Sequence, residues 1–297
     1  MALRLEDYMQ WPEIEALEYA ECGRPETVLG PRMIGKSHVL VTALFREADS
    51  VKVKVLDTKK EYSMEKMEEM GYYAVLIPAK KIPSYHFLVK RGKEQEEMPD
   101  PYAMESQIDG LDMNRFNHGI HDTIYQKLGA HPMTLEGTRG TYFAVWAPNA
   151  RAVSVVGNFN NWDPGSHPMR FLPDAGIYEL FVPGIGKGEI YKFRLLDSIG
   201  KEVLKADPFA SYAEFRPKTA SIVWDSDHTW NDKKWMEARK KWKVKKEAML
   251  IYEVSLAGFC KPKDTDAEER ESFCNYRDIA PVLSKYCEEM GYTHVEL

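Results

Sequence analysis

The sequence predicts a mainly β chain with two tandem immunoglobulin-like antiparallel β-sandwiches, followed by a strand–helix–strand unit. Three observations support this fold class. Short β-branched runs alternate with turns that contain Gly and Pro through most of the chain. One pattern of such runs occurs twice. Near the end of the chain, an apolar run precedes a segment of helical periodicity and a second apolar run.

The internal repeat is visible when one segment is placed over the other. Residues 71–78 (GYYAVLIP) match residues 176–183 (GIYELFVP), and residues 100–103 (DPYA) match residues 207–210 (DPFA). The offset between the copies grows only slightly along the chain, as small loop insertions would make it. Within the first copy, Val51, Val53 and Val55 alternate with lysines, which predicts one buried and one exposed strand face. We therefore expect each copy to close its own core.

The predicted domains follow from these patterns. We expect a short amphipathic helix first, a partly helical linker between the sandwiches, and a lysine-rich helical connector whose tryptophans pack inward. The last unit should contain a strand at 248–256 buried on both faces, a polar excursion at 260–272, a helix at 276–290 ended by Gly291, and a strand at 293–297. The predicted boundaries are 1–20 for the helix, 21–110 for the first sandwich, 111–127 for the linker, 128–228 for the second sandwich, 229–247 for the connector and 248–297 for the last unit.

Composition disfavours charged partners. The 297 residues include 40 basic and 46 acidic side chains, and this net charge of −6 attracts neither nucleic acid nor an anionic membrane. The basic segment at 230–246 contains acidic residues as well, which favours a solvated helix face over a nucleic-acid patch. No apolar run approaches membrane-spanning length, and no basic, apolar leader opens the chain. We therefore expect a cytoplasmic protein with a neutral substrate, no nucleic-acid partner and no membrane contact.

Metal and cofactor sites are not expected. The four cysteines form no CxxC pair and have no histidine at metal-ligand spacing, which predicts reduced thiols. His118, His121 and Asp122 lie close together in the sequence but lack further ligands at helical spacing. We interpret these three as surface polar residues, and we expect neither a metal nor a cofactor.

The stretch at residues 142–212 organises the chain. A β-branched strand at 152–156 leads into a turn rich in Asn, Asp and Pro at 158–164 (NFNNWDP), so Trp162 is expected at a strand end. The blocks FAVWAPNA, VSVVGNFNNWD, GIYELFVPG, YKFRLLD and KADPFA follow in that order. They resemble the carbohydrate-binding module that precedes the barrel in 1,4-α-glucan (glycogen) branching enzymes of the α-amylase clan. The resemblance extends, more weakly, over nearly the whole chain.

The resemblance implies a glucan site in the second sandwich. In related modules the tryptophan of the FNNW turn stacks on a sugar and the lysine of the YKF strand bonds a hydroxyl, because a flat ring suits the apolar face of a pyranose. These residues are Trp162 and Lys192 here, with Asn160 and Asn161 as further hydrogen-bonding groups. The alternative is that Trp162 caps the sandwich edge and Lys192 is an ordinary strand lysine. The first copy has VLDTKKEYS in place of the turn and His86 in place of the lysine.

The implied ligand is an α-1,4-glucan, such as glycogen, amylose or a maltooligosaccharide. Related modules that hold glycogen have a second aromatic residue soon after the YKF strand, whereas residues 195–204 contain none. A single ring would bind weakly, with a dissociation constant in the millimolar range, or about 4 kcal/mol.

The last unit resembles the opening of the branching-enzyme (β/α)8 barrel, which this chain is expected to leave incomplete after its second strand begins. Retaining enzymes of this clan use two carboxylates about 5 Å apart, which in the family lie on later barrel strands. No residue here matches those motifs, so none is assigned as catalytic. Glu253 and Glu296 lie in mid-strand among apolar neighbours, and we interpret them as structural.

Three functions are compatible with these features. The first is the N-terminal part of a 1,4-α-glucan branching enzyme, which in glycogen biosynthesis transfers α-1,4 chains to 6-hydroxyls. We expect the 297-residue chain to be inactive by itself. The second is a free-standing, non-catalytic α-glucan-binding protein. The third is another hydrolase of the clan, debranching or trehalose-releasing. The presence of two repeats and the LGAHP segment at residues 128–132 disfavour this third function.

Overall fold

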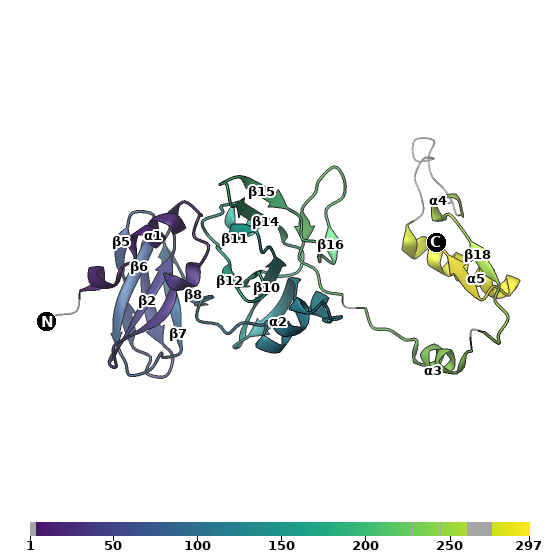
Figure 1. Ribbon diagram of the computed structural model, residues 1–297, viewed down its shortest axis with the longest axis horizontal. Helices are drawn as coiled ribbons and strands as arrows, with labels where there is room; N and C mark the ends of the chain where they lie inside the picture. Colours follow the sequence, from purple (N-terminus) through teal and green to yellow (C-terminus); the bar gives the residue numbers. More distant parts are fainter. Residues whose placement is uncertain (1–3, 227, 244, 260–274) are drawn as a thin grey trace. The chain divides into compact units, whose positions relative to one another are not determined.

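A computed structural model describes residues 4–226, 228–243, 245–259 and 275–297 of the chain (Figure 1). It separates into two compact units, Met1–Ser226 and Asp227–Leu297. Most elements of the first unit are antiparallel strands, so the prediction of a mainly β chain is confirmed.

The first repeat forms two antiparallel sheets, with strand orders β1-β2-β6-β5 and β4-β3-β7-β8. Val51, Val53 and Val55 of β3 are buried, and the lysines between them are exposed or half-buried, as their alternation predicts. The strands are β1 (Gly30–Ile34), β2 (His38–Leu44), β3 (Ser50–Val55), β4 (Glu61–Ser63), β5 (Glu65–Glu68), β6 (Tyr72–Pro78), β7 (Tyr85–Arg91) and β8 (Glu94–Pro99).

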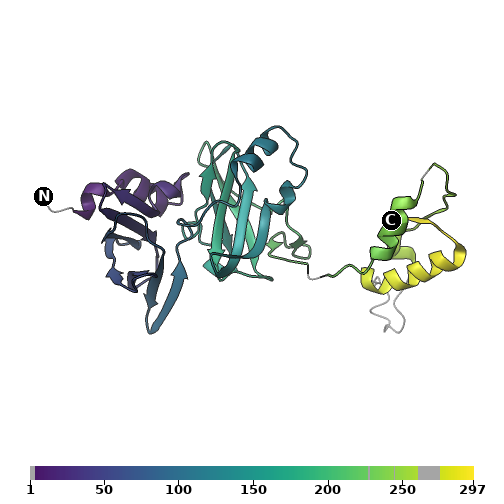
Figure 2. The ribbon, with the colours of Figure 1, turned by 90° about the horizontal axis from the view of Figure 1, so that it is seen from below.

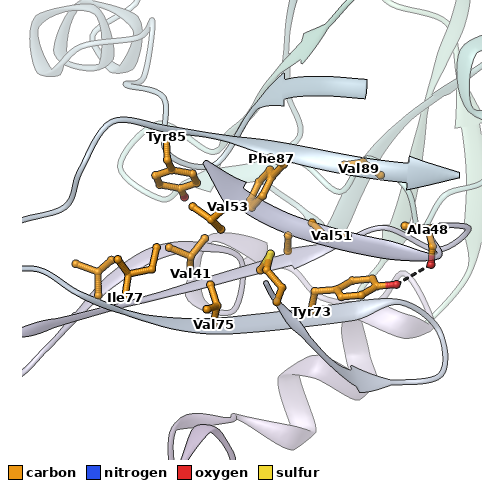
Figure 3. Close-up of a cluster of buried hydrophobic side chains, with 13 residues drawn as sticks. Val41, Ala48, Val51, Val53, Tyr73, Val75, Ile77, Tyr85, Phe87 and Val89 are labelled. Atoms are coloured by element: carbon orange, nitrogen blue, oxygen red, sulfur yellow. Dashed lines mark hydrogen bonds between the residues drawn. The ribbon is translucent and has the colours of Figure 1, made fainter. Parts of the chain in front are cut away.

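Side chains from these two sheets share one core (Figure 3). Val53 of β3 and Phe87 of β7 face Val75 of β6 across the gap between the sheets, and all three are buried. Tyr73 closes one end of this core, where its hydroxyl donates to the carbonyl of Ala48 at 2.6 Å. The buried phenol therefore keeps a hydrogen-bond partner, as burial of a polar group requires.

The second repeat forms two further antiparallel sheets (Figure 2, teal and green strands). Their orders are β12-β13-β10-β9 and β11-β14-β17-β16, with β15 also paired to β14. A second core of buried residues includes Phe143 of β10, Val155 of β11 and Phe193 of β14. The strands are β9 (Gly129–Leu135), β10 (Thr138–Trp146), β11 (Ala150–Gly157), β12 (Arg170–Leu172), β13 (Ile177–Pro183), β14 (Ile190–Asp197), β15 (Glu202–Lys205), β16 (Tyr212–Ala213) and β17 (Ser221–Ile222).

The two copies share a buried tyrosine–aspartate hydrogen bond. The hydroxyl of Tyr85 on β7 donates to Asp100 at 2.5 Å, and the hydroxyl of Tyr191 on β14 donates to Asp207 at 2.5 Å. Each aspartate also accepts from the backbone amide two residues further along, at 2.9 Å in the first copy and 2.8 Å in the second. The DPYA and DPFA segments therefore close equivalent corners of the two copies.

This corner makes stability depend on pH. Burial raises the pKa of the Asp100 carboxyl from 3.8 to about 6, and Tyr85 and backbone amides only partly oppose this. Because the folded pKa exceeds the unfolded one, the stabilisation is complete below pH 3.8 and is lost as pH rises through 6.

We expect Asp100→Asn to remove this pH dependence. Between pH 4 and pH 7, the unfolding free energy of the unchanged chain should fall relative to that of the variant by on the order of 3 kcal/mol. Urea denaturation at several pH values measures this difference. A constant difference between the two proteins across this range would contradict the prediction.

Helices cover the outer faces of two sheets. The predicted N-terminal helix is present as a 3-10 turn, η1 (Leu5–Tyr8), and a helix, α1 (Trp11–Glu18). Ile14 and Leu17 of α1 join a buried cluster with Leu40 and Tyr72 of the first repeat. The predicted linker contains α2 (Gly110–Asn117), whose apolar residues pack against buried residues of β10 and β13. The short η3 turn (Ile124–Gln126) follows.

The second unit contains the predicted strand, helix and strand. β18 (Ile251–Glu253) pairs in parallel with β19 (His294–Glu296), and α5 (Tyr276–Met290) lies between them in the sequence. Gly291 ends α5 with a φ of 76°, which a glycine adopts without strain. Leu256, the last residue of the strand predicted at 248–256, instead begins a one-turn helix, α4 (Leu256–Phe259). The predicted polar excursion at 260–272 lies outside the described residues.

One expectation for this unit is wrong and another is met only in part. β18 is not buried on both faces, because Ile251 and Glu253 are exposed and only the opposite side packs toward α5. The connector forms α3 (Lys233–Lys241), in which no residue is buried; Trp235 is 60% exposed and makes a surface cation–π contact with Arg239, which lies 5.3 Å from the centre of its ring. Trp242, just after α3, is half-buried and its ring centre lies 5.0 Å from that of His294, so this tryptophan packs as expected.

Candidate functional site

The turn that contains Trp162 follows the end of β11 and has an unusual backbone conformation. After Gly157, a 3-10 turn, η4 (Asn158–Asn160), precedes two residues with positive φ, 53° at Asn161 and 61° at Trp162. For a large residue such as Trp162 this conformation costs roughly 1–2 kcal/mol, whereas asparagine adopts it more readily. Strain of this kind is retained where the surrounding structure holds it, often at functional sites. The predicted strand-end position of Trp162 is confirmed.

The side chain of Asn160 holds this turn through hydrogen bonds to the backbone of β11. Its side chain is buried; its Oδ1 accepts from the Gly157 amide at 2.9 Å and its Nδ2 donates to the Val155 carbonyl at 3.0 Å. The same Nδ2 lies 2.9 Å from Nδ1 of His167. Burial lowers the pKa of His167 to about 4, so the ring is neutral at pH 7 and Nδ1 can accept this bond. The Asn160 amide is therefore occupied within the protein.

Trp162 presents its ring to solvent. Its backbone amide donates to the Gly157 carbonyl at 2.9 Å, and its indole Nε1–H donates to Asn158 Oδ1 at 3.0 Å. The side chain nevertheless stays 37% exposed. Because the indole N–H already has a partner, the ring face is the part of Trp162 that remains for a ligand. Asn161, next to it, is exposed.

Lys192 lies at the same end of the same sheet. In the β11–β14 ladder, Gly157 is opposite Tyr191 and Val156 is opposite Lys192. Tyr191 points into the core, so Lys192 points outward. Its Nζ donates to Thr219 Oγ1 at 2.7 Å. The structure thus brings the Trp162 turn and Lys192 to one sheet end, as the resemblance implies.

The first copy lacks such a site. Its corresponding segment continues into strand β4, which pairs with β3. His86, in the place of Lys192, bonds Glu97 through Nδ1 at 3.0 Å. Only the second copy therefore has an exposed aromatic turn in this position.

We expect Asn160→Ala to destabilise the turn. It removes the partners of the Gly157 amide and the Val155 carbonyl, and each unsatisfied buried group costs about 1–3 kcal/mol. The melting temperature should fall, whereas Asn161→Gly, which changes an exposed residue and keeps one that tolerates the positive φ of 53°, should not lower it. Equal effects of the two substitutions in thermal unfolding would contradict this account.

A second aromatic pair is present that the sequence interpretation missed. Tyr212 on β16 and Trp224, just after β17, have ring centres 4.8 Å apart. Both lie on the far side of β14 from the Trp162 turn, and not in the 195–204 segment where a second ring was sought. The alternation of Ile222, Val223 and Trp224, with Val223 in the core, is the sequence signal that could have placed Trp224 on the outer face.

The other candidate residues have different surroundings from those expected. The side chain of His121 is only 5% exposed and bonds Asp112 at 3.0 Å, because α2 brings Asp112 over it, so its assignment to the surface is wrong. His118 and Asp122 are exposed. Within the described ranges, no group of three or more His, Cys, Asp or Glu residues is arranged to hold a metal ion.

The remaining predicted residues are two carboxylates of the second unit and the four cysteines. Glu253 and Glu296 are register partners in the β18–β19 pair and both are exposed. Cys22 and Cys287 are buried free thiols, and burial raises the pKa of Cys22. Cys260 and Cys274 lie outside the described residues. No helix among the described segments is both long and apolar enough to cross a membrane.

The class of the site-bearing segment follows from comparison with known families. Residues 127–210, which include the Trp162 turn and Lys192, match carbohydrate-binding module 48, the isoamylase N-terminal domain. Residues 10–102 match the N-terminal domain of the alpha-1,4-glucan branching enzyme GlgB. The chain thus combines a branching-enzyme N-terminal domain with a carbohydrate-binding module.

Curated relatives define the family further. The chain is 39% identical to the 1,4-alpha-glucan branching enzyme GlgB of Synechococcus sp. (strain JA-2-3B'a(2-13)) over 92% of its length, and 37% identical to that of Pseudomonas putida over 96%. GlgB 1 of Streptomyces coelicolor is 41% identical over 76% of this chain and 28% of its own. The chain belongs to the 1,4-alpha-glucan branching enzyme family. It spans 39% of the length of the Synechococcus and Pseudomonas relatives.

The solved structures that align with the chain are more distant. The type I pullulanase of Bacillus subtilis, solved in complex with maltose, aligns with 77% of this chain and 30% of its own at 15% identity and a TM-score of 0.33. A likeness of this size has no bearing on the fold or the site.

Proposed function

We propose that this chain is a glucan-holding part of a 1,4-α-glucan branching enzyme and that it binds an α-1,4-glucan on its second repeat. The observation on which this depends is the exposed ring of Trp162, held in a strained turn by Asn158 and Asn160. Backbone strain that keeps a large apolar ring exposed to water is better explained by ligand binding than by packing within the protein.

Each site residue has a distinct role in this proposal. Trp162 stacks on the apolar face of a glucose ring, and Lys192 donates a hydrogen bond to a sugar hydroxyl from the same sheet end. Asn161, exposed beside the ring, offers a further amide for a hydroxyl. Asn160 positions the turn and does not touch the sugar, because its amide is occupied by Gly157 and Val155.

The proposed architecture assigns a role to each part of the chain. Each pair of sheets is an immunoglobulin-like β-sandwich, supported by the shared core between the sheets in both repeats. Residues 248–297 form the opening of a (β/α)8 barrel, supported by the parallel β18–β19 pair with α5 between its strands. The remaining boundaries are those predicted from the sequence.

The proposed activity of the longer family members is cleavage of an α-1,4 chain and its transfer to a 6-hydroxyl. In that reaction the second repeat would hold the donor or acceptor chain near the site of transfer. The 297-residue chain by itself should form no branches, so the iodine colour of amylose should persist in its presence.

Binding to immobilised polysaccharide tests the proposal. The chain should be retained on amylose beads, be eluted by free maltoheptaose, and pass unretarded through cellulose beads. Both polymers consist of glucose, but only amylose has α-1,4 linkages, so retention on amylose alone indicates a shaped site. Passage through both columns, or equal retention on both, would contradict the proposed function.

A further inference from the structure

The outer face of the β11-β14-β17-β16 sheet has a second aromatic surface beyond the Trp162 turn. Tyr212 and Trp224 are 51% and 36% exposed, and their ring planes differ by 33°. Lys187 Nζ lies 4.1 Å from the centre of the Trp224 ring. Together the two exposed rings form one contiguous apolar surface, and surfaces of this kind mark sites of interaction more often than single exposed rings do.

The register places these rings on the same face as Lys192. Across the sheet, Ile190 of β14 is opposite Ile222 of β17, which in turn is opposite Tyr212 of β16. Lys192 is two residues from Ile190 on the same strand, and Trp224 is two residues from Ile222. Opposite residues share a face, and side chains two apart along a strand share it too. The Lys192–Thr219 bond follows the same direction, from β14 toward the β16–β17 hairpin.

The rest of this face is partly covered. Arg194, two residues from Lys192, is 3% exposed and donates to the carbonyl of Ala20 in the N-terminal segment, and it also pairs with Glu202. Arg151, at the start of β11, pairs with Glu21 of the same segment at 2.8 Å. The N-terminal segment therefore covers the part of the face near Arg194, while Lys192 is half-buried and Tyr212, at the other edge of the sheet, is exposed.

We infer that Tyr212, backed by Trp224, is a second stacking platform for the same α-glucan chain that Trp162 and Lys192 hold. This inference rests on the proposed function. Two strand spacings separate Tyr212 from Ile190 on β14, which is roughly 10 Å across the sheet. Lys192 lies two residues from Ile190, roughly 7 Å along β14. A linear glucan of a few sugar rings spans this distance, whereas a very short one occupies a single platform.

Tyr212 adds a second stacking ring to the one that Trp162 provides. Two stacking contacts on one ligand act as linked sites, so the second adds affinity without a second loss of translational freedom. Affinity should therefore rise with glucan length until both platforms are occupied. Maltotriose should bind weakly and maltoheptaose more tightly.

Calorimetric titration of the full 297-residue chain with maltotriose and with maltoheptaose tests the inference. Tyr212→Ala should weaken maltoheptaose binding about three- to tenfold and leave maltotriose binding unchanged. Tyr212→Phe, which keeps the ring, should bind both sugars as the unchanged chain does. Phe215→Ala removes a 90% exposed ring from the same hairpin and serves as the matched control, with no expected effect.

The outcomes separate this inference from the proposed function. If Tyr212→Ala binds maltoheptaose as tightly as the unchanged chain, while Trp162→Ala loses both sugars, the second platform does not exist and the proposed function stands. If the unchanged chain binds neither sugar, the proposed function fails, and the platform fails with it. Overlapping thermal melting curves for the Tyr212 variants establish that a loss of affinity is not a loss of fold.

Discussion

Replacing Arg170 with methionine is expected to lower the free energy of unfolding by about 3–5 kcal/mol. Arg170 of β12 is opposite Glu179 of β13, whose side chain is fully buried. The guanidinium donates to Oε1 of Glu179, while the hydroxyls of Tyr142 and Ser106 donate to Oε2. Arg170→Met leaves a buried carboxylate without its counter-charge, which is among the costliest single changes in a protein.

Two further variants show whether the buried charge is the cause. Arg170→Met combined with Glu179→Gln removes the charge while keeping an oxygen for the two hydroxyls, so it should recover much of the lost stability. Arg151→Met breaks the exposed pair with Glu21, where both side chains are about half exposed, and should cost less than 1 kcal/mol. Chemical denaturation measures all three; an effect of Arg170→Met no larger than that of Arg151→Met would refute this account of Glu179.

Replacing Trp162 with alanine is expected to abolish retention on amylose. The ring supplies the stacking surface at the sheet end, and its loss should weaken binding at least tenfold, or about 1.4 kcal/mol. The fold should persist, because the turn is held by backbone bonds and by Asn160, not by the indole ring. Affinity electrophoresis in gels containing amylose measures the change directly.

The matched control for this substitution is Trp235→Ala. Trp235 on α3 is 60% exposed and lies in the other compact unit, so its loss removes a comparable exposed ring without touching the site. Its retention should equal that of the unchanged chain. Equal loss in both variants would indicate non-specific hydrophobic adsorption and not a glucan site at Trp162.

Much of the fold could be predicted from the sequence because its signals are local and repeated. The alternation in β3, the glycine that ends α5 and the matching DPYA and DPFA corners each specify an element from a few residues. The parallel pairing of β18 and β19 also followed from the strand–helix–strand pattern.

Other features depended on contacts that no local pattern specifies. The burial of His121 depends on α2 bringing Asp112 to it, and the exposure of β18 depends on how little of the chain packs against it. Tyr212 and Trp224 meet only because β16 and β17 pair, although eleven intervening residues separate them in the sequence. The same reason explains why only part of the candidate site could be predicted. Trp162 and Lys192 lie in recognisable sequence blocks. The buried, turn-holding role of Asn160 depends on contacts such as the one with His167, which the sequence does not specify.

The central claim is that an α-glucan lies on the ring of Trp162 at the open end of the β11–β14 sheet. The most direct measurement is a nuclear magnetic resonance titration of the 15N-labelled chain with maltoheptaose, in which the indole N–H signals are assigned with single Trp→Phe variants. The claim predicts a saturable shift of the Trp162 signal together with amide shifts around Lys192, and no shift of Trp235. A saturable response elsewhere in the chain, with the Trp162 signal unmoved, would contradict it.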